Sequence, residues 1–440
     1  MRPNARKRTQ RERLLEGMVE ASRRRGYVGA SIAAVIAAAG VSRPTFYDYF
    51  ADRDACFLAA IEDVQGELLA AVEDALADRK PSEALPAAVT SVLEFASAHG
   101  ERARFLMADS TSGGRLALDA RDEGIARIAA QIERAQADAK PGTPLADIDC
   151  RVALGAIYRM VAMRQRRGQA PVSKLAGELL GWLSAYEAPA GRRRWGTATP
   201  GPVPERSRHL PAVPVQQMPT VFPPGRVRAS GSEVAENHRL RIMWAAARVA
   251  AAKGYNAATV ADIQKLARVN AGTFYRHFAD KQETLAAVHE LGFQQVIDVT
   301  LRAFFAEQAW PQRSWEAGRA LTQFLQENPL VAHVGFVEAN AVGPGPIQRI
   351  EDSHTAFLFF LQEGLLHTGP REPPSQVAME AIVASVFELI YMRARVAGDP
   401  QIAGMLGYIA HLWLTPFLGV KDANAFIERQ LRSAQQAHRG

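Results

Sequence analysis

Residues 42–50 read Ser-Arg-Pro-Thr-Phe-Tyr-Asp-Tyr-Phe, and residues 270–278 read Asn-Ala-Gly-Thr-Phe-Tyr-Arg-His-Phe. Thr, Phe, Tyr and Phe occupy the same places in both. The offset of 228 positions holds without a gap from Gly26 to Arg53, and 12 of these 28 residues are identical to their counterparts. A repeat of this length indicates a folded unit that occurs twice, because a chance match would not extend beyond the tetrad.

The residues up to and including the first copy predict three helices, with a tight turn between the second and the third. Apolar side chains at helical spacing predict an amphipathic helix over residues 9–25, which Gly26 ends. Ser31 has N-cap character for a short second helix. Gly40 can adopt the positive φ of a helix-turn-helix bend, and Ser42 caps a third helix.

The third predicted helix is held by two aromatic anchors. Phe46 and Phe50 are i, i+4 partners and should face inward. Tyr47 differs from these two anchors. Its counterpart Tyr275 is also a tyrosine, and a ring that only fills a buried site would not require the hydroxyl group that both residues have. A nucleic-acid phosphate is the obvious partner for such a hydroxyl, although aromatic residues in helices are often plain core.

The composition predicts an all-α protein of more than one domain. The 440 residues are rich in Ala, Leu, Arg and Glu, only 8% are aromatic, and no sustained apolar/polar alternation occurs. Cys56 and Cys150 are far apart, which argues against a disulfide framework, and both are expected to be buried. Because we find neither a secretory signal nor an apolar run of about 18–20 residues, we expect a cytoplasmic protein without membrane contact.

Positive charge is concentrated in the repeats and between them. Of the net charge of +6, residues 1–58 carry +5, residues 188–232 carry +6 and residues 233–289 carry +3, whereas 59–187 and 290–440 each carry −4. This distribution is typical of parts that meet a polyanion, but a solvated basic surface would explain the charge alone equally well.

The repeated unit resembles the DNA-binding headpiece of the TetR (tetracycline-repressor) family of bacterial transcription regulators. The resemblance rests on Gly26-Tyr27, Ser31-Ile32, Ala39-Gly40-Val41-Ser42, Thr45-Phe46-Tyr47, Phe50 and Asp52-Arg53. In the second copy it rests on Gly254-Tyr255, Thr259 to Ile263, Val269, Gly272 to Tyr275, His277-Phe278 and Asp280-Lys281. Thr259 and Asp262 also have the spacing of a capping box.

The resemblance implies roles for individual residues. The residues that match phosphate-contacting positions of the family are Ser31, Tyr47, Tyr49, Arg53, Thr259, Tyr275, His277 and Lys281. Those that match base-facing positions are Arg43, Pro44, Thr45, Asp48, Ala271, Gly272, Thr273 and Arg276. The division agrees with the geometry of a helix in the major groove, whose outward side chains meet bases while its ends reach the backbone.

Two residues depart from a symmetric pair of headpieces. The turn glycine of the first unit is replaced by Arg268 in the second, so that turn must accept a non-glycine residue or carry some strain. Asp48 brings a carboxylate near the DNA and corresponds to Arg276. The two predicted recognition helices therefore cannot read the same half-site.

The pattern predicts five regions: a headpiece at 9–55, a helical core at 56–187, a flexible linker at 188–232, a headpiece at 233–283 and a core at 284–436. The linker holds nine prolines and the cluster Arg192-Arg193-Arg194, which we expect to be solvated or on phosphate. Predicted core helices lie at 54–80, 84–98, 117–138, 148–166, 173–186, 282–307, 312–327, 346–367, 375–397, 401–418 and 422–436. Met107, Tyr158, Met163, Trp182, Phe336, Phe357, Phe360, Tyr391 and Trp413 are candidates to line a pocket, or plain core.

Family regulators bind as homodimers, so the resemblance implies a single-chain pseudo-dimer in which the helices at 148–166 and 173–186 pack on those at 375–397 and 401–418. Its expected partners are double-stranded DNA, at an imperfect or asymmetric operator, and a small apolar or aromatic effector that releases a repressor. Association of two such chains stays open. The sequence holds no catalytic constellation, metal cluster or phosphate-binding Gly loop, so we expect no enzyme, metal or cofactor. The alternative is a helical ligand-binding or partner-binding adaptor in which one or both headpieces have lost DNA binding.

Overall fold

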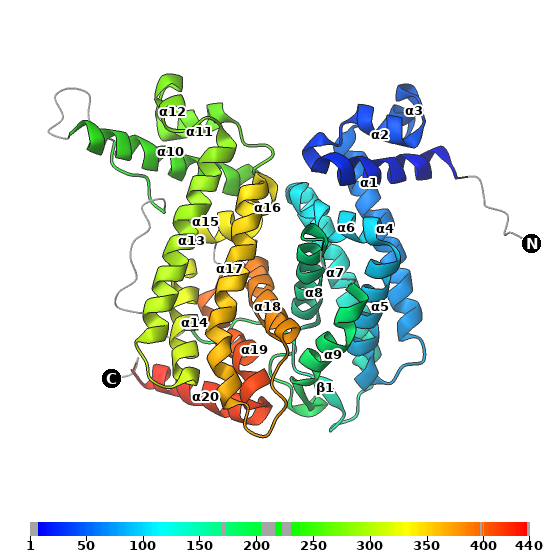
Figure 1. Ribbon diagram of the computed structural model, residues 1–440, viewed down its shortest axis with the longest axis vertical. Helices are drawn as coiled ribbons and strands as arrows, with labels where there is room; N and C mark the ends of the chain where they lie inside the picture. Colours follow the sequence, from blue (N-terminus) through cyan, green and yellow to red (C-terminus); the bar gives the residue numbers. More distant parts are fainter. Residues whose placement is uncertain are drawn as a thin grey trace, which may run out of the picture. The chain divides into compact units, whose positions relative to one another are not determined.

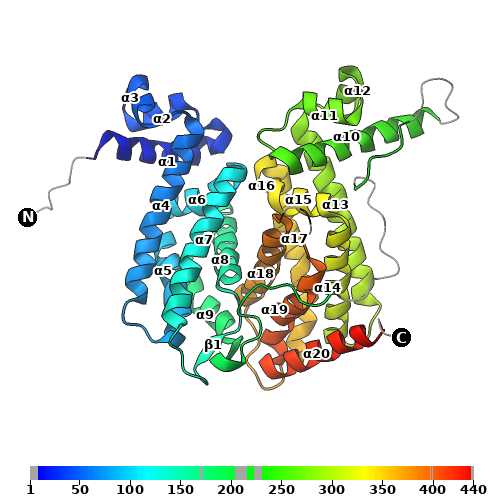
Figure 2. The same cartoon turned by 180° about the vertical axis from the view of Figure 1, so that it is seen from behind.

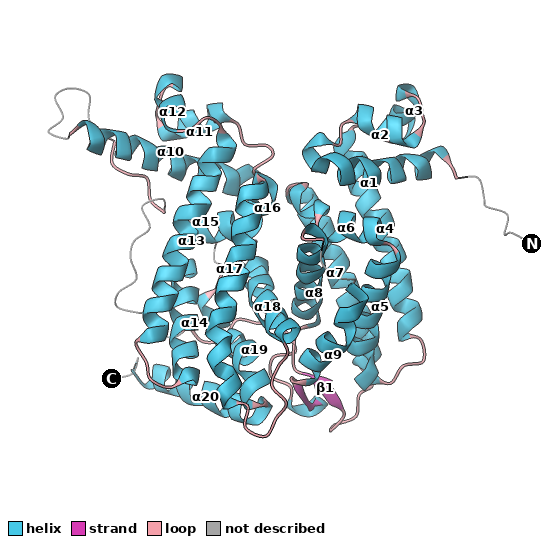
Figure 3. Cartoon of the chain, in the orientation of Figure 1, coloured by secondary structure: helices cyan, strands magenta, loops and turns pink. Residues whose placement is uncertain are grey.

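The chain is almost entirely helical, as its composition predicts. The computed structural model describes residues 8–168, 172–203, 216–221, 230–396, 398 and 400–437. Figure 3 shows the helices and the short strand pair formed by β1 (Pro144–Ala146) and β2 (Glu187–Pro189), which run antiparallel. Two compact units divide the chain: Met1–Thr143 with Ile157–Leu180, and Pro144–Ala156 with Gly181–Gly440. Within the described ranges, no helix is long and apolar enough to cross a membrane.

The first unit begins with a three-helix headpiece and continues into a helical core (Figure 1). The headpiece consists of α1 (Gln10–Gly29), α2 (Ile32–Ala39) and α3 (Arg43–Tyr49). The core contains α4 (Arg53–Leu76), η1 (Pro81–Glu83), α5 (Ala84–Ala98), α6 (Gly100–Met107), η2 (Asp109–Ser112), α7 (Arg115–Gln136), the larger part of α8 (Cys150–Arg166), η3 (Val172–Leu175) and the start of α9 (Ala176–Ser184).

Local capping sets the limits of the headpiece helices. Thr9 and Glu12 form a capping box that starts α1. Gly26 has φ 66° and interrupts α1, but a further turn continues to Gly29, so the predicted stop at Gly26 is a kink. Ser31 caps α2 by accepting a hydrogen bond from the Ala34 N–H (3.3 Å). Gly40 follows with φ 60°.

Aromatic contacts join the first headpiece to its core. Phe57 of α4 is buried and meets Tyr27 of α1 edge to face, with ring centroids 4.8 Å apart. On its other side Phe57 meets Phe105 of α6 in the same way, at 5.1 Å. Such pairs prefer edge-to-face geometry because of the ring quadrupole. The first headpiece therefore packs against α4 and α6 and does not form a separate domain.

The second unit repeats this plan (Figure 2). Its headpiece consists of α10 (Gly231–Lys253), α11 (Val260–Ala267) and α12 (Ala271–His277). Its core contains α13 (Lys281–Phe305), α14 (Trp310–Glu327), α15 (Pro329–His333), the π-helical η5 (Val334–Glu338), α16 (Ala339–Val342), α17 (Pro344–Gln362), η6 (Glu363–His367), α18 (Gln376–Ala394), η7 (Ala403–Met405), α19 (Leu406–Leu418) and α20 (Val420–Ala437), with η4 (Ala190–Arg192) from the segment before the headpiece.

Residues that follow the first core fold into this second unit. The buried carboxylate of Asp147 accepts hydrogen bonds from the backbone N–H groups of Arg194 (3.0 Å) and Trp195 (2.5 Å). The Trp195 ring is only 7% exposed and stacks on Tyr408 of α19, with centroids 5.7 Å apart. The Arg194 guanidinium pairs with Glu428 of α20 at 2.9 Å.

These contacts correct the prediction of a flexible linker for residues 188–203, while Arg192 and Arg194 stay exposed, as expected for solvated arginines. Asp149 is also buried and accepts from the Ala198 N–H at 2.7 Å. Two buried carboxylates need donors, and backbone N–H groups of this segment supply them, while Trp195 adds apolar surface. Linker residues 204–215 and 222–229 lie outside the described ranges.

A close approach of two helices also marks the second unit. Gly155 of α8 belongs to it, and a Cβ atom there would overlap the carboxyl group of Glu388 on α18. Glu388 is only 2% exposed. Because no larger residue fits without displacing this side chain, Gly155 is what permits the contact.

Candidate nucleic-acid interface and ligand cavities

The two third helices, α3 and α12, are built alike. Ser42 and Asn270 cap them by accepting hydrogen bonds from the N–H groups three residues later, at 3.2 and 2.8 Å. The aromatic anchors are buried as predicted: Phe46 is 0%, Phe50 6%, Phe274 0% and Phe278 4% exposed. Each helix therefore has one face fixed in the headpiece and the opposite face open to a partner.

The tyrosines of these helices lie on the open face. Tyr47 is 48%, Tyr49 44% and Tyr275 59% exposed. Their rings stand beside buried anchors, since Tyr47 meets Phe46 and Tyr275 meets Phe274 edge to face. This placement leaves the hydroxyl groups accessible, which the proposed contact with phosphate requires.

The predicted base-facing residues show the same exposure in both helices. Thr45 and Thr273 are half-buried, whereas the other members are exposed: Arg43, Pro44, Asp48, Ala271, Gly272 and Arg276. The pattern of exposure is thus conserved while the chemistry is not. Asp48 offers a carboxylate acceptor where Arg276 offers guanidinium donors.

Two predicted phosphate-contacting cations are engaged inside their headpieces. The Arg53 guanidinium lies over the Tyr27 ring (4.3 Å), donates to the Tyr27 hydroxyl (2.8 Å) and pairs with Asp54. Lys281 lies over the Tyr255 ring (4.4 Å) and donates to the carbonyl oxygens of Tyr255 and Ala258, each at 2.9 Å. Burial lowers the pKa of Lys281. Either cation would have to exchange these partners to reach a phosphate.

The other three predicted phosphate contacts differ in character. Ser31 and Thr259 are exposed N-caps, and Thr259 forms the predicted capping box with Asp262. His277 is half-buried beside His238, with centroids 6.3 Å apart. Burial first, and then the nearby Arg276 and Arg239, lower the pKa of His277. His277 is therefore a neutral group at neutral pH.

The turn before each third helix reveals a pair of residues that the sequence reasoning missed. Arg13 donates to the carbonyl oxygens of Ala39 (2.7 Å) and Gly40 at the end of α2. Arg241 donates to those of Ala267 and Arg268 (2.8 Å) at the end of α11. These bonds satisfy helix carbonyls that lack intrahelical partners. The signal was present, because Arg13 and Arg241 are 228 positions apart, the offset of the repeat.

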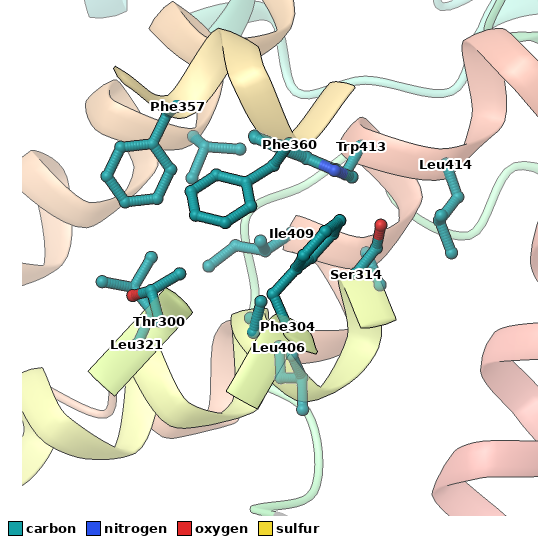
Figure 4. A pocket seen from close by; sticks show the side chains of 14 residues that line it. Thr300, Phe304, Ser314, Leu321, Phe357, Phe360, Leu406, Ile409, Trp413 and Leu414 are labelled. Atoms are coloured by element: carbon teal, nitrogen blue, oxygen red, sulfur yellow. The ribbon is translucent and has the colours of Figure 1, made fainter. Parts of the chain in front are cut away.

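The second core contains two small apolar cavities. One, of about 30 Å³, is lined by residues that include Phe304, Phe357, Phe360 and Trp413, as Figure 4 shows. The other, of about 50 Å³, is lined by residues that include Phe336 and again Phe357. Four of the predicted lining candidates thus face these cavities. The remaining candidates are buried away from both: Met107, Tyr158, Met163, Trp182 and Tyr391.

A π-helical turn connects the larger cavity with the second headpiece. Gly335 and Phe336 of η5 line the cavity. Two residues later, the buried Glu338 accepts a hydrogen bond from the backbone N–H of Tyr255 (2.8 Å) in the turn after α10. Its other carboxylate oxygen meets His333 at 3.1 Å. One short element therefore contacts both the cavity and the headpiece.

Comparison with known proteins identifies both headpieces. The family described as bacterial regulatory proteins, tetR family, matches residues 14–60 and 242–288. The HTH-type transcriptional repressor KstR of Mycolicibacterium smegmatis is 31% identical over 124 residues, which are 27% of this chain and 60% of KstR. The chain thus matches less than two thirds of the length of that curated relative.

Two solved structures are also similar to parts of the chain. A tetR-family regulatory protein from Rhodococcus RHA1 is 24% identical and covers 44% of this chain and 95% of its own, with a TM-score of 0.34. A gamma-butyrolactone receptor (ArpA like protein) is 16% identical and covers 46% of this chain and 99% of its own, with a TM-score of 0.37. The family model thus matches once in each half of the sequence, at the offset of the internal repeat, and the chain carries two headpieces of the kind described for bacterial regulatory proteins of the tetR family.

Proposed function

We propose that the protein is a DNA-binding transcriptional repressor that reads two different half-sites, one with α3 and one with α12. One observation carries this proposal. Asp48 and Arg276 occupy equivalent, exposed positions of two helices that are otherwise anchored alike, but their side chains have opposite charge. A carboxylate accepts a hydrogen bond from the cytosine amino group, whereas a guanidinium donates to guanine O6 and N7. The proposed operator is therefore an imperfect or asymmetric repeat.

In this proposal, phosphate contacts set the register of each helix. Exposed hydroxyls of Tyr47, Tyr49 and Tyr275 serve the backbone, with Ser31 and Thr259 at the helix N-termini. Arg53 and Lys281 contribute chiefly by joining the start of the first core helix, α4 or α13, to Tyr27 or Tyr255 of the headpiece, because their hydrogen bonds are already made inside the protein.

We further propose that the two halves act as one intramolecular pseudo-dimer with the five regions expected from the sequence. Support comes from the second unit, which incorporates residues 144–156 and 181–203 from the first half and the following segment. A long connector raises the effective concentration of one half for the other. Association of two such chains remains compatible with the proposal.

Release from DNA is proposed to start in the second core. An effector that enlarges the cavity beside Phe336 would displace η5 and with it the Glu338 carboxylate that holds the Tyr255 N–H. The second headpiece would then change its tilt against α13, and α12 would leave the register of its half-site. A ligand can act in this way only if it prefers the displaced state.

The proposal is tested by footprinting and electrophoretic mobility shifts on DNA flanking the gene. Tyr47→Phe and Tyr275→Phe remove only a hydroxyl, and Tyr47→Ala and Tyr275→Ala remove the ring as well. We expect each Ala variant to weaken binding about 10-fold or more and each Phe variant to weaken it less, with a steep decline in added salt. If no DNA sequence is protected at moderate salt, the proposal of a DNA-binding regulator is wrong. If only the Tyr47 variants weaken binding, the proposal that both headpieces bind DNA is wrong.

An adaptor without DNA binding is the second candidate. It is favoured by the engagement of Arg53 and Lys281 and by the left-handed backbone of Arg268. The same assays decide between the two, because an adaptor would bind no DNA fragment at any salt concentration while the cavities of its second core stayed functional.

A further inference from the structure

The two cavities of the second core follow one face of a single helix. His289, Phe293 and Val296 of α13 line the larger cavity, and Thr300 and Phe304 line the smaller one. His289 and Phe304 are 15 residue steps apart, which corresponds to about 22 Å of helix at 1.5 Å per residue. Together the cavities outline a long, narrow volume parallel to α13.

Two apolar side chains are shared by the two cavities. Leu321 and Phe357 line both of them. The Phe357 ring contacts Phe360 at 5.6 Å and Phe387 at 5.7 Å between centroids, and Figure 4 shows Phe357 beside Phe360. Free volumes of about 30 and 50 Å³ correspond to one or two water molecules, so a ligand must first turn these side chains aside.

Two polar side chains line this apolar volume with an atom that makes no hydrogen bond in the described part of the chain, namely Ser314 in the smaller cavity and His289 in the larger one. His289 is 6% exposed, and its Nδ1 makes no hydrogen bond within the described part of the chain. Burial, and secondarily the nearby Arg349, lower the pKa of His289 to about 4. The imidazole is therefore neutral at physiological pH, and a buried polar group left in this state destabilises the empty form.

From this arrangement we infer that the second core binds an extended, largely apolar molecule of which one uncharged oxygen function, a hydroxyl or a carbonyl, hydrogen-bonds to His289. The inference deepens the proposed function, because this molecule would be the effector. The length of the paired cavities sets the extended shape, and the aromatic and aliphatic lining sets the apolar character. His289 fixes which end of the molecule points toward the headpiece side of α13.

The charges around His289 favour a neutral group over an ion. Arg349 is already paired with Glu290, so a ligand carboxylate would have to compete with Glu290 for the guanidinium. A ligand ammonium group would lie near the Arg349 cation, and the imidazole that it would meet carries no negative charge. A hydroxyl or carbonyl oxygen needs no counter-ion and loses little hydration when it enters.

The test measures binding of three probes with the same ten-carbon chain, namely 1-decanol, decanoate and decylammonium. Titration calorimetry on the full-length protein gives the affinities, and Trp413, which lines the smaller cavity, gives a fluorescence signal. We expect 1-decanol to bind at least 5-fold more tightly than either ion. His289→Leu should weaken 1-decanol about 5- to 10-fold, the size of one buried hydrogen bond.

Two further variants keep this test decisive. His354→Leu replaces another buried histidine of the same core, which lies beside Phe387 and lines neither cavity, and should leave 1-decanol binding within 2-fold. Val296→Phe fills the larger cavity without changing His289 and should abolish binding. Unchanged 1-decanol affinity in folded His289→Leu, or equal affinity for all three probes, would overturn the inference.

DNA binding is measured separately, so that the two proposals can fail independently. If 1-decanol binds through His289 but leaves the affinity for the footprinted DNA unchanged, the ligand site stands and its role as effector site is overturned. If the protein protects no DNA while His289→Leu still lowers the affinity for 1-decanol, the proposal of a DNA-binding regulator is wrong and the ligand site stands. Release of DNA by 1-decanol in the wild type but not in Val296→Phe supports both.

Discussion

The turn between the second and third helices passes through Gly40 in one headpiece and Arg268 in the other, and both residues are left-handed, with φ of 60° and 54°. Glycine adopts this conformation without cost, whereas a side chain costs about 1–2 kcal/mol. Arg241 lies against the same turn, and the nearby Arg268 charge is a secondary cause, after burial, of the lowered pKa of Arg241. The second headpiece therefore carries strain that the first does not.

Replacing Arg268 by Gly should stabilise the second unit. Relief of the left-handed strain outweighs the extra flexibility of glycine in the unfolded chain, which leaves a gain of about 0.5–1 kcal/mol in the free energy of unfolding. The reverse change, Gly40→Arg, should cost about 1 kcal/mol or more, since a Cβ there would press on the Arg13 guanidinium at 3.1 Å. Urea unfolding of both variants measures the two changes in the free energy of unfolding. If both variants were stabilised, or both destabilised, the assignment of strain to Arg268 would be contradicted.

His289 predicts a pH dependence of stability. Its folded pKa of about 4 lies below the ordinary value of 6.5, so below pH 6.5 the unfolded chain takes up a proton that the folded chain refuses. Stability is therefore lost as pH falls from about 6.5 to 4. Between pH 7 and 5 the wild type should lose about 2 kcal/mol more than His289→Leu, at 1.36 kcal/mol per pH unit.

Urea unfolding at both pH values measures this difference between the two proteins. His411, whose pKa burial also lowers to about 4, is present in both and cancels. Parallel pH profiles for wild type and variant would show that His289 does not titrate in this way.

At the scale of elements, the π-helical η5 connects the larger cavity of the second core with the second headpiece. A π turn is rare and often marks a functional site, because its wider bond pattern holds less firmly than an α-helix. Phe336 faces the cavity and Glu338 holds the Tyr255 N–H. We have found no equivalent in the first headpiece, where the Tyr27 hydroxyl instead accepts from Arg53 and donates to Asp54.

Glu338→Ala should loosen the second headpiece selectively. The Tyr255 N–H would be left buried without its acceptor, which costs about 1–3 kcal/mol locally. Amide hydrogen exchange should accelerate in residues 255–258, while exchange in α18 should stay unchanged. Glu338→Gln keeps an acceptor oxygen and should behave nearly as the wild type. Uniform acceleration across the unit would instead indicate general destabilisation.

Periodicity predicted the long helices well. The predicted helix at 84–98 is α5, Ala84–Ala98, and the predicted helix at 148–166 differs from α8 by two residues. Short elements without a repeating apolar face were missed, namely α6, α15, η5 and α16, because their limits depend on tertiary contacts such as that of Glu338.

The candidate interface was also partly accessible from sequence. Burial of Phe46 and Phe274 followed from their spacing, and exposure of Tyr47 and Tyr275 followed from the retained hydroxyl. The partners of Lys281 did not follow, because carbonyl groups brought together by a fold leave no mark in the sequence. For the same reason, a buried Trp195 in a proline-rich segment was not predicted.

At the scale of the whole molecule, the two recognition helices can be made alike. The triple variant Arg43→Ala, Pro44→Gly, Asp48→Arg gives α3 the base-facing residues of α12, since Thr45 already equals Thr273. We expect it to prefer a palindrome of the α12 half-site over the natural operator by at least about 10-fold, given roughly 1–3 kcal/mol for each good contact to a base. Selection of binding sites from random DNA measures the preference.

A matched control for this experiment is Asp48→Ala alone, which removes one readout without copying the other. It should relax specificity in one half-site and create no preference for a palindrome. If the triple variant retains the preference of the wild type, α3 does not read the bases.

The contact between Gly155 and Glu388 has an evolutionary consequence. In a symmetric homodimer every residue occurs twice, so a change at an interface must be compatible with its own copy across the twofold axis. Here a glycine from the first half of the sequence receives a glutamate from the second half, and neither has to tolerate itself. With both halves in one chain, each side of such a contact can change without a matching change in a copy of itself, and the same freedom applies to α3 and α12, which differ at Asp48 and Arg276.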